Sequence, residues 1–173
     1  IQDDAEWVMK DINLSENTVF SDSHGIYVRT LETFGYNLNH GSSSRFGSLI
    51  IAENRVNSQS NGIYIDEILE FGYKMGDNSS FEMKDILVAG NSITSVGDGI
   101  YLRELSGFGN DLNDWSSVKI GYIIFKENEI DSEMRGIITD QITSLGLHMS
   151  GRSTFIMRDI KFDSNNIISV GYG

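Results

Sequence analysis

Apolar and polar positions recur along this chain with a period of 37 residues. Within each period, short segments alternate apolar and polar residues, which predicts strands with one buried face. The clearest segments are VMKDINL, RFGSLII, EMKDILV, KIGYIIF and IMRDIKF, beginning at residues 8, 45, 82, 119 and 156. A second apolar segment follows in the form GIYV, GIYI, GIYL or GIIT. No long run keeps a helical period, so the pattern predicts an all-β chain.

Asparagine, serine and glycine repeat at the same spacing, without insertion or deletion. Three columns result: Asn17, Asn54, Asn91, Asn128 and Asn165; Ser21, Ser58, Ser95, Ser132 and Ser169; and Gly25, Gly62, Gly99, Gly136 and Gly173. The chain therefore holds 173/37, or about 4.7, units. Repeats of this kind are typical of solenoids, in which each unit stacks on the next.

Stacked rungs of strands explain each column. If one unit forms one rung, equivalent residues lie about 4.8 Å apart along the axis, and each apolar column becomes an internal ladder. We expect the asparagines to form a hydrogen-bonded amide ladder at a left-handed corner, the serines to act similarly through their hydroxyls, and the glycines to supply positive φ. The pattern predicts a parallel β-helix of about five 37-residue rungs, forming a single domain over residues 1–173. Tetratricopeptide and ankyrin arrays have similar periods, but the glycine and asparagine columns argue against helices.

A longer period of 74 residues, or two rungs, overlies the first. The column of Lys10, Lys84 and Arg158 alternates with Gly47 and Gly121, and the column of Asp11, Asp85 and Asp159 alternates with Ser48 and Tyr122. A further column reads Arg29, Asp66, Arg103 and Asp140. Opposite charges on adjacent strands attract, whereas identical neighbours would repel. We infer that this super-repeat determines which rung lies on which.

The strand pattern with its Asn and Ser positions, followed by GIYI, resembles the right-handed parallel β-helix repeat of carbohydrate-associated and microbial surface proteins. The resemblance covers the whole chain. It implies a right-handed coil and an extracellular or cell-surface location. Relatives in that family include polysaccharide lyases and hydrolases, phage tailspikes, adhesins and archaeal surface proteins. The rungs here are longer than is common in the family, and the extra residues are predicted to form the loop from Phe34 to Ser43 and its copies.

Composition narrows the range of partners. The net charge of −12 disfavours contact with nucleic acid and with anionic membranes. No apolar run is long enough to span a membrane, so we expect no membrane insertion by this segment. The chain has no cysteine, which excludes disulfides and thiolate metal sites. It also has no proline, which is typical of continuously paired strands.

Paired carboxylates are the first candidate chemistry. In β-helix enzymes, carboxylates that hydrolyse sugars project from a strand face, and Asp11, Asp85 and Asp159 could do so here. These residues recur with the repeat, however, whereas a catalytic site needs a unique pocket and carboxyl groups with different pKa values. We therefore predict a solvated face, no enzymatic activity and no required cofactor.

Acidic loops are the second candidate. Asp77, Asp111 and Asp114 lie in the segments GDNSS and GNDLNDW, and clustered hard oxygen ligands suit calcium. Neither loop matches the EF-hand spacing or the glycine-rich calcium nonapeptide, so the alternative is a solvated acidic loop.

Two further features bear on recognition of sugars. Tyr27, Tyr64 and Tyr101 share one column, which could form an outward platform for sugars or simply pack. Asn13 in NLS and Asn78 in NSS are acceptor triplets for N-linked glycosylation if the protein is exported.

The sequence as a whole predicts a structural or adhesive β-solenoid segment of a microbial cell-surface protein or extracellular filament. The alternative is a carbohydrate-active enzyme, a carbohydrate-binding module or a phage receptor-binding spike on the same fold. No terminal cap is recognisable, although solenoid ends expose apolar side chains and unpaired strands. We expect a window from a longer array, or a unit that forms a homo-oligomer by head-to-tail or lateral packing, with surface glycans as further partners.

Overall fold

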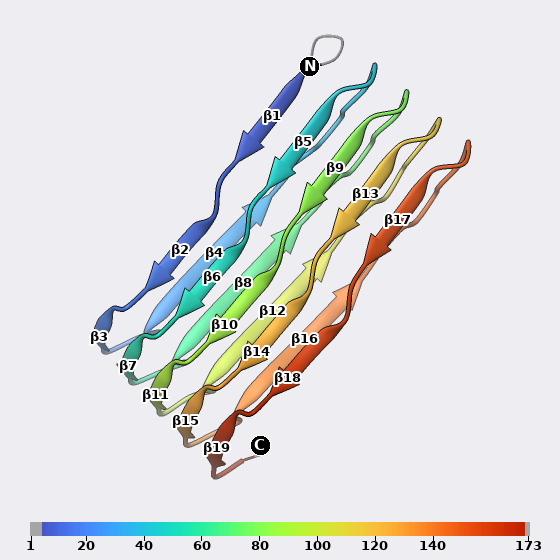
Figure 1. The fold of residues 1–173 in the computed structure, drawn as a ribbon. Helices are drawn as coiled ribbons and strands as arrows, with labels where there is room; N and C mark the ends of the chain where they lie inside the picture. Colours follow the sequence, from blue (N-terminus) through green and yellow to red (C-terminus); the bar gives the residue numbers. More distant parts are fainter. Residues whose placement is uncertain (1–4, 172–173) are drawn as a thin grey trace.

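The computed structural model describes residues 5–171, which form nineteen strands and no helix. The strands stack into four parallel sheets (Figure 1). Sheet A contains β1 (Glu6–Met9), β5 (Ser43–Phe46), β9 (Ser80–Met83), β13 (Ser117–Ile120) and β17 (Thr154–Met157). Sheet B contains β2 (Ile12–Ser15), β6 (Leu49–Ala52), β10 (Ile86–Ala89), β14 (Ile123–Lys126) and β18 (Ile160–Asp163). Sheet C contains β3 (Thr18–Ser21), β7 (Arg55–Ser58), β11 (Ser92–Ser95), β15 (Glu129–Ser132) and β19 (Asn166–Ser169). Sheet D contains β4 (Ile26–Glu32), β8 (Ile63–Leu69), β12 (Ile100–Ser106) and β16 (Ile137–Thr143).

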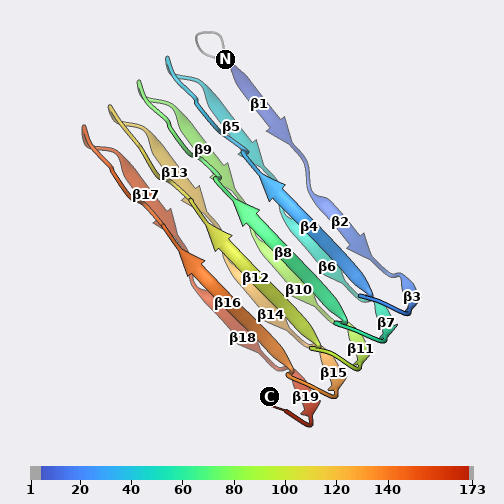
Figure 2. The ribbon, with the colours of Figure 1, turned by 180° about the vertical axis from the view of Figure 1, so that it is seen from behind.

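Each repeat unit forms one turn of the coil. In sheet B, Ile86 lies opposite Leu49 on one side and Ile123 on the other, an offset of one unit in both directions. The chain runs along sheets A and B on one broad side, turns through sheet C, and returns along sheet D on the other side (Figures 1 and 2). It advances from blue to red as a right-handed coil, which confirms the predicted parallel β-helix.

The number of turns is lower than expected. The structure contains four complete turns, and the fifth has strands in sheets A, B and C only, because β16 is the last strand of sheet D. Gly173, the fifth member of the glycine column, lies outside the described residues.

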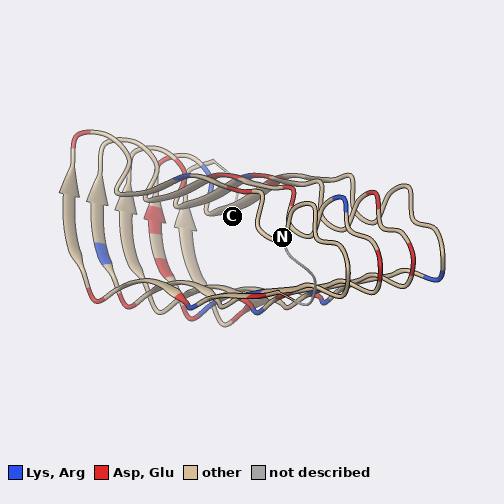
Figure 3. Cartoon of the chain, turned by 90° about the horizontal axis from the view of Figure 1, so that it is seen from above, with Lys and Arg blue, Asp and Glu red and all other residues tan. Residues whose placement is uncertain are grey.

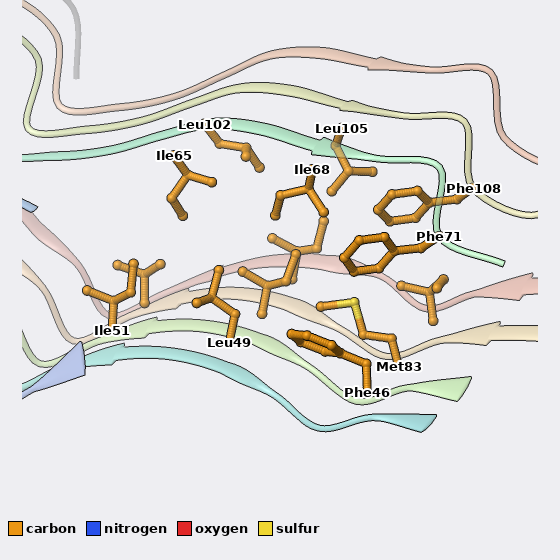
Figure 4. Close-up of a cluster of buried hydrophobic side chains, with 14 of the residues drawn as sticks. Phe46, Leu49, Ile51, Ile65, Ile68, Phe71, Met83, Leu102, Leu105 and Phe108 are labelled. Carbon is orange, nitrogen blue, oxygen red and sulfur yellow. The ribbon is translucent and has the colours of Figure 1, made fainter. Parts of the chain in front are cut away.

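The core lies between the two broad sides. Phe46, Leu49 and Ile51 point inward from β5 and β6 and face Ile65 and Ile68 of β8 (Figure 4). All five side chains are at most 1% exposed. The rings of Phe71 and Phe108 close the core beside the loops and stack at a centroid distance of 5.2 Å. The apolar columns of the sequence are therefore internal ladders, as expected.

The left-handed corner involves a different residue from the one expected. None of the column asparagines has a positive φ within residues 5–171. The residue immediately before each asparagine has a φ between 53° and 62°, namely Glu16, Glu53, Gly90, Glu127 and Ser164. The chain bends one residue before the asparagine. The asparagine side chain can then point inward and reach the neighbouring turns of the coil.

Glycine is required in two columns of the repeat, for a different physical reason in each. A second column, at Gly35, Gly72, Gly109 and Gly146, has φ values of 63° to 70°, so glycine there permits left-handed turns. The column that includes Gly62 was expected to supply positive φ, and this expectation is wrong, because none of its members within residues 5–171 has a positive φ. A Cβ atom on Gly62 would lie 2.2 Å from Cγ2 of Ile93 and 2.6 Å from the Gly99 carbonyl oxygen. Close contact between neighbouring turns, rather than backbone handedness, therefore requires glycine at this position.

Candidate functional site

The asparagine column forms a continuous ladder through the solenoid. Asn91 Nδ2 donates to Asn128 Oδ1 at 2.9 Å and to the Ile51 carbonyl at 2.9 Å, and the Asn91 backbone N–H also donates to Asn128 Oδ1 at 3.1 Å. Asn54 donates to Asn91 in the same way. Asn54, Asn91 and Asn128 are each 1% exposed. These amides are saturated by the fold, so they hold turns together and offer no site for a ligand.

The serine column acts within each turn rather than between turns. Ser58 Oγ donates to the carbonyls of Ser60 and Asn61 at 3.2 and 3.1 Å, and Ser95 Oγ donates to the Asp98 carbonyl at 3.2 Å. The expected inter-rung role is wrong, because the short hydroxyl is directed at carbonyls of its own corner.

The acidic column between sheets A and B binds the backbone of the next turn. Asp11 Oδ1 accepts the backbone N–H of Ser48 at 2.7 Å, and Asp85 Oδ1 accepts that of Tyr122 at 2.7 Å. A charged acceptor makes such a bond stronger than a neutral one. Two of the three carboxylates considered for catalysis therefore join neighbouring turns, while Asp159 in the last turn is exposed.

Tyrosines and charged residues form a cluster on the outer face of sheet D. The rings of Tyr27 and Tyr64 stack at a centroid distance of 5.1 Å, and those of Tyr64 and Tyr101 at 5.2 Å. The hydroxyls of Tyr27 and Tyr64 donate to Asp66 at 3.0 and 2.8 Å, and the Arg103 guanidinium also donates to Asp66. Burial raises the pKa of Asp66, but the hydrogen bonds from Arg103 and the two tyrosines outweigh burial and hold this pKa below its ordinary value.

Stacking covers most of the ring faces within the tyrosine column. The planes of Tyr64 and Tyr101 differ by 8°, and Tyr64 lies between the other two rings. The Arg135 guanidinium lies 5.7 Å from the centroid of Tyr101. Both faces of the Tyr64 ring are therefore covered, whereas Tyr27 at the end of the column is 47% exposed. A sugar that stacks on an aromatic face would have to displace these contacts, so the geometry favours packing over a sugar platform.

We expect Tyr64, at the centre of this cluster, to ionise only near pH 12. Burial, followed by the hydrogen bond to Asp66, raises the pKa of Tyr64 to about 12 from an ordinary 10.0. Because folding favours the neutral phenol, its stabilisation is fully present below pH 10 and is lost as the pH rises to about 12. Titration of the tyrosinate absorbance band, with circular dichroism to follow folding, measures this step.

Two variants separate the two causes of the raised Tyr64 pKa, which are burial and the hydrogen bond to Asp66. Tyr64→Phe should remove the step near pH 12, and Asp66→Asn should lower the pKa of Tyr64 only in part, since burial is the larger cause. A step near pH 12 that survives in Tyr64→Phe would show that another tyrosine produces it.

The calcium candidates line a depression among the loops. These loops lie at the edge of the coil opposite sheet C (Figure 1). Asp77, Asp111 and Asp114 all contribute to its wall. His148 Nδ1 lies 3.1 Å from Asp111 Oδ1, and His40 Nδ1 lies 3.3 Å from Asp77 Oδ2. Across residues 5–171, no three His, Cys, Asp or Glu side chains come together as a metal-binding group. Calcium binding stays a prediction for this loop edge.

The two glycosylation candidates lie in different settings. Asn13 is in β2, where its Oδ1 accepts the hydroxyl of Ser15, and Asn78 is in the loop before β9. Both residues are exposed. Glycosylation of these asparagines stays a prediction.

Sequence reasoning missed an ion pair between a buried carboxylate and a partly exposed arginine. Asp98 is 3% exposed and accepts two hydrogen bonds of 2.9 Å from the Arg135 guanidinium in the next turn. Asn61, in the turn before, accepts the Asp98 backbone N–H at 3.0 Å through its Oδ1. The available signal was a column of side-chain acceptors, Asn61 and Asp98, followed by a cation.

No protein-family model, curated protein or solved structure matches this chain. Among the described residues, no helix is long and apolar enough to cross a membrane. Acidic and basic positions are spread over strands, corners and loops of successive turns (Figure 3). The parallel β-solenoid is thus established by its own geometry.

Proposed function

We propose that this chain is a structural or adhesive rod segment, of a microbial cell-surface protein or an extracellular filament, whose ends contact further β-solenoid turns. The resemblance to the parallel β-helix repeat of microbial surface proteins supports the location. The observation that carries the structural role is the loss of burial at the two ends of otherwise regular internal columns.

The C-terminal end leaves core residues uncovered. Phe125 and Phe162 occupy the same column in adjacent turns, and their rings stack at 5.1 Å. Phe125 is 0% exposed, whereas Phe162 is 55% exposed. Within residues 5–171, Phe125 is covered by the turn that contains Phe162, whereas no further turn covers Phe162. An uncovered apolar ladder of this kind offers both hydrophobic area and unpaired strand edges to a further turn.

The N-terminal end has the same character. Leu14 and Val19 are only partly buried, while their counterparts one turn later, Ile51 and Val56, are at most 2% exposed. Trp7, in the first turn, is 42% exposed. Stacking of further turns would cover these side chains and pair the backbone edges, which is how solenoid arrays obtain their stability.

The polar clusters support a structural role over carbohydrate chemistry. Asp11 and Asp85 are bound to the backbone of the next turn, and the Tyr64 ring is covered on both faces. Each arrangement serves contact between turns.

Sedimentation of the isolated chain over a range of concentrations tests end contact. We expect association that increases with concentration. The Phe162→Asp variant should reduce this association, because it places a charge on the uncovered apolar end.

A matched control is Phe20→Asp. Phe20 is 75% exposed in β3, where it alternates with the inward-facing Val19 and Ser21. This change should leave the sedimentation behaviour as in the parent. A parent chain that stays monomeric at every concentration, or an equal effect of the two variants, would contradict the proposal.

A further inference from the structure

The corner between sheets A and B alternates between two chemistries. Odd-numbered turns have a basic residue followed by aspartate, as at Lys84 and Asp85. Even-numbered turns have glycine in place of the basic residue, at Gly47 and Gly121. We call these Asp turns and Gly turns. The structure shows what each type requires of its neighbour.

Each Asp turn binds the Gly turn that follows it. The 2.7 Å bonds from the Ser48 and Tyr122 amides to Asp11 and Asp85 both run from a Gly turn back to the Asp turn before it. The carboxylate therefore faces the C-terminal direction of the coil, and it is satisfied by the backbone just after the glycine.

Only glycine fits above the aspartate. A Cβ atom on Gly47 would lie 2.3 Å from Asp11 Oδ1 and 2.7 Å from the Asp11 backbone nitrogen. On Gly121 it would lie 2.3 Å from Asp85 Oδ1 and 2.5 Å from the Lys84 carbonyl oxygen. Two of these contacts are with backbone atoms, so a side chain could be accommodated only by moving one turn away from the other.

The fifth turn is an Asp turn with no Gly turn above it. Asp159 is exposed, and within residues 5–171 its carboxylate makes no hydrogen bond or ion pair. Its position repeats that of Asp11 and Asp85 in the earlier Asp turns.

The same two-turn alternation occurs in sheet D, in the column of Arg29, Asp66, Arg103 and Asp140. Asp66 receives the Tyr27 hydroxyl from the turn before and the Arg103 guanidinium from the turn after. Asp140 receives the Tyr101 hydroxyl at 3.1 Å from the turn before, as Asp66 does from Tyr27. By the pattern at Asp66, the strand that follows Asp140 should carry arginine.

We propose that the end turn at Asp159 is phase-selective, so that the turn stacked on it must be a Gly turn. That turn has glycine beside the Asp159 carboxylate and arginine on the strand opposite Asp140. A turn with a side chain at the glycine position is held away from the end. This inference rests on the proposed end contact and adds the chemistry of the contacting turn.

A second copy of this chain in register would place an Asp turn on an Asp turn, with Lys10 at the position where glycine is required. Self-association of the isolated chain through the apolar surface at Phe162 should therefore be out of register and weaker than the stacking of a Gly turn.

Two extended chains of equal length test the phase rule. The in-phase chain is the full chain followed by a second copy of residues 100–136, which places copies of Arg103 and Gly121 over Asp140 and Asp159. The out-of-phase chain is followed instead by a second copy of residues 63–99, which places copies of Asp66 and Lys84 there. Both additions are natural turns of this protein with 37 residues each.

We expect the in-phase chain to unfold at a temperature several degrees above both the parent and the out-of-phase chain. The amide of the copied Tyr122 should show hydrogen-exchange protection comparable with that of Tyr122 itself. Asp159→Ala should remove that protection in the in-phase chain and leave the melting temperature of the parent unchanged. In the out-of-phase chain, glycine in place of the copied Lys84 should recover part of the stabilisation.

The outcomes separate the two proposals. Equal stabilisation by both additions would overturn phase selection while leaving end contact intact. Absence of stabilisation from either addition, and from the glycine-repaired chain, would contradict end contact itself.

Discussion

Replacing Asn91 with alanine is expected to lower the free energy of unfolding by about 2–5 kcal/mol. The change removes the oxygen that accepts two hydrogen bonds from Asn54 and the nitrogen that donates to the Ile51 carbonyl. Asn54 and Asn91 are each 1% exposed, so water does not replace the lost partners. A buried polar group left without a partner costs about 1–3 kcal/mol. The Asn54 backbone N–H loses its acceptor, and the Asn54 side-chain amide and the Ile51 carbonyl each lose one further bond. Denaturant titration of parent and variant measures the difference.

Asn17→Ala is the matched control for this prediction. Asn17 belongs to the same column, but it is exposed in the first turn, where it donates to Asn54 Oδ1 and to the Ser15 carbonyl. Its removal should cost about 1 kcal/mol or less, since solvent reaches the groups it leaves. Equal losses for the two variants would mean that the ladder does not draw its strength from burial.

The repeat made the interior of this fold predictable. In a solenoid, residues one unit apart in sequence lie side by side, so a column read from the sequence is a contact in space. The burial of Ile86 and Ile123, at most 1% exposed, follows directly from their apolar column. The same logic placed the asparagine amides in contact, because an identical polar residue at an inward position must find its partner in the next turn.

Corner geometry could not be obtained in this way. A column identifies which residue types recur, but the backbone angle belongs to whichever residue bends the chain, and here that is Glu53 rather than Asn54. Gly62 illustrates the same limit. Its sequence pattern is equally consistent with positive φ and with close contact, and only the 2.2 Å approach to Ile93 decides between them.

The roles of the candidate site residues could not be predicted fully, because a sequence pattern does not show which way a side chain points. Asp85 could be recognised as a recurrent carboxylate, but its bond to the Tyr122 amide depends on the bend between sheets A and B. The alternation of aspartate and glycine was visible in the sequence, whereas the steric reason for it was not. The pairing of Asp98 with Arg135 was missed, because these residues do not repeat along their column.

Replacing Phe125 with alanine is expected to cost about 3–5 kcal/mol, as for other fully buried phenylalanines. Phe125 is 0% exposed and stacks on Phe162 at 5.1 Å. The substitution leaves a cavity between two turns that are held in register by their strand pairing, so the surroundings can close it only in part. Thermal or denaturant unfolding measures the loss.

Phe162→Ala serves as the control and as an independent measure of end contact. At low protein concentration Phe162 is 55% exposed, so its removal should cost about 1 kcal/mol or less. If further turns stack on this end, the same variant should become more costly as the protein concentration rises, because the phenylalanine is then buried and association is lost with it. The cost of Phe125→Ala should change little over the same range, since Phe125 is covered in either state. A cost for Phe162→Ala that is independent of concentration and equal to that of Phe125→Ala would contradict the exposed end from which the structural role was argued.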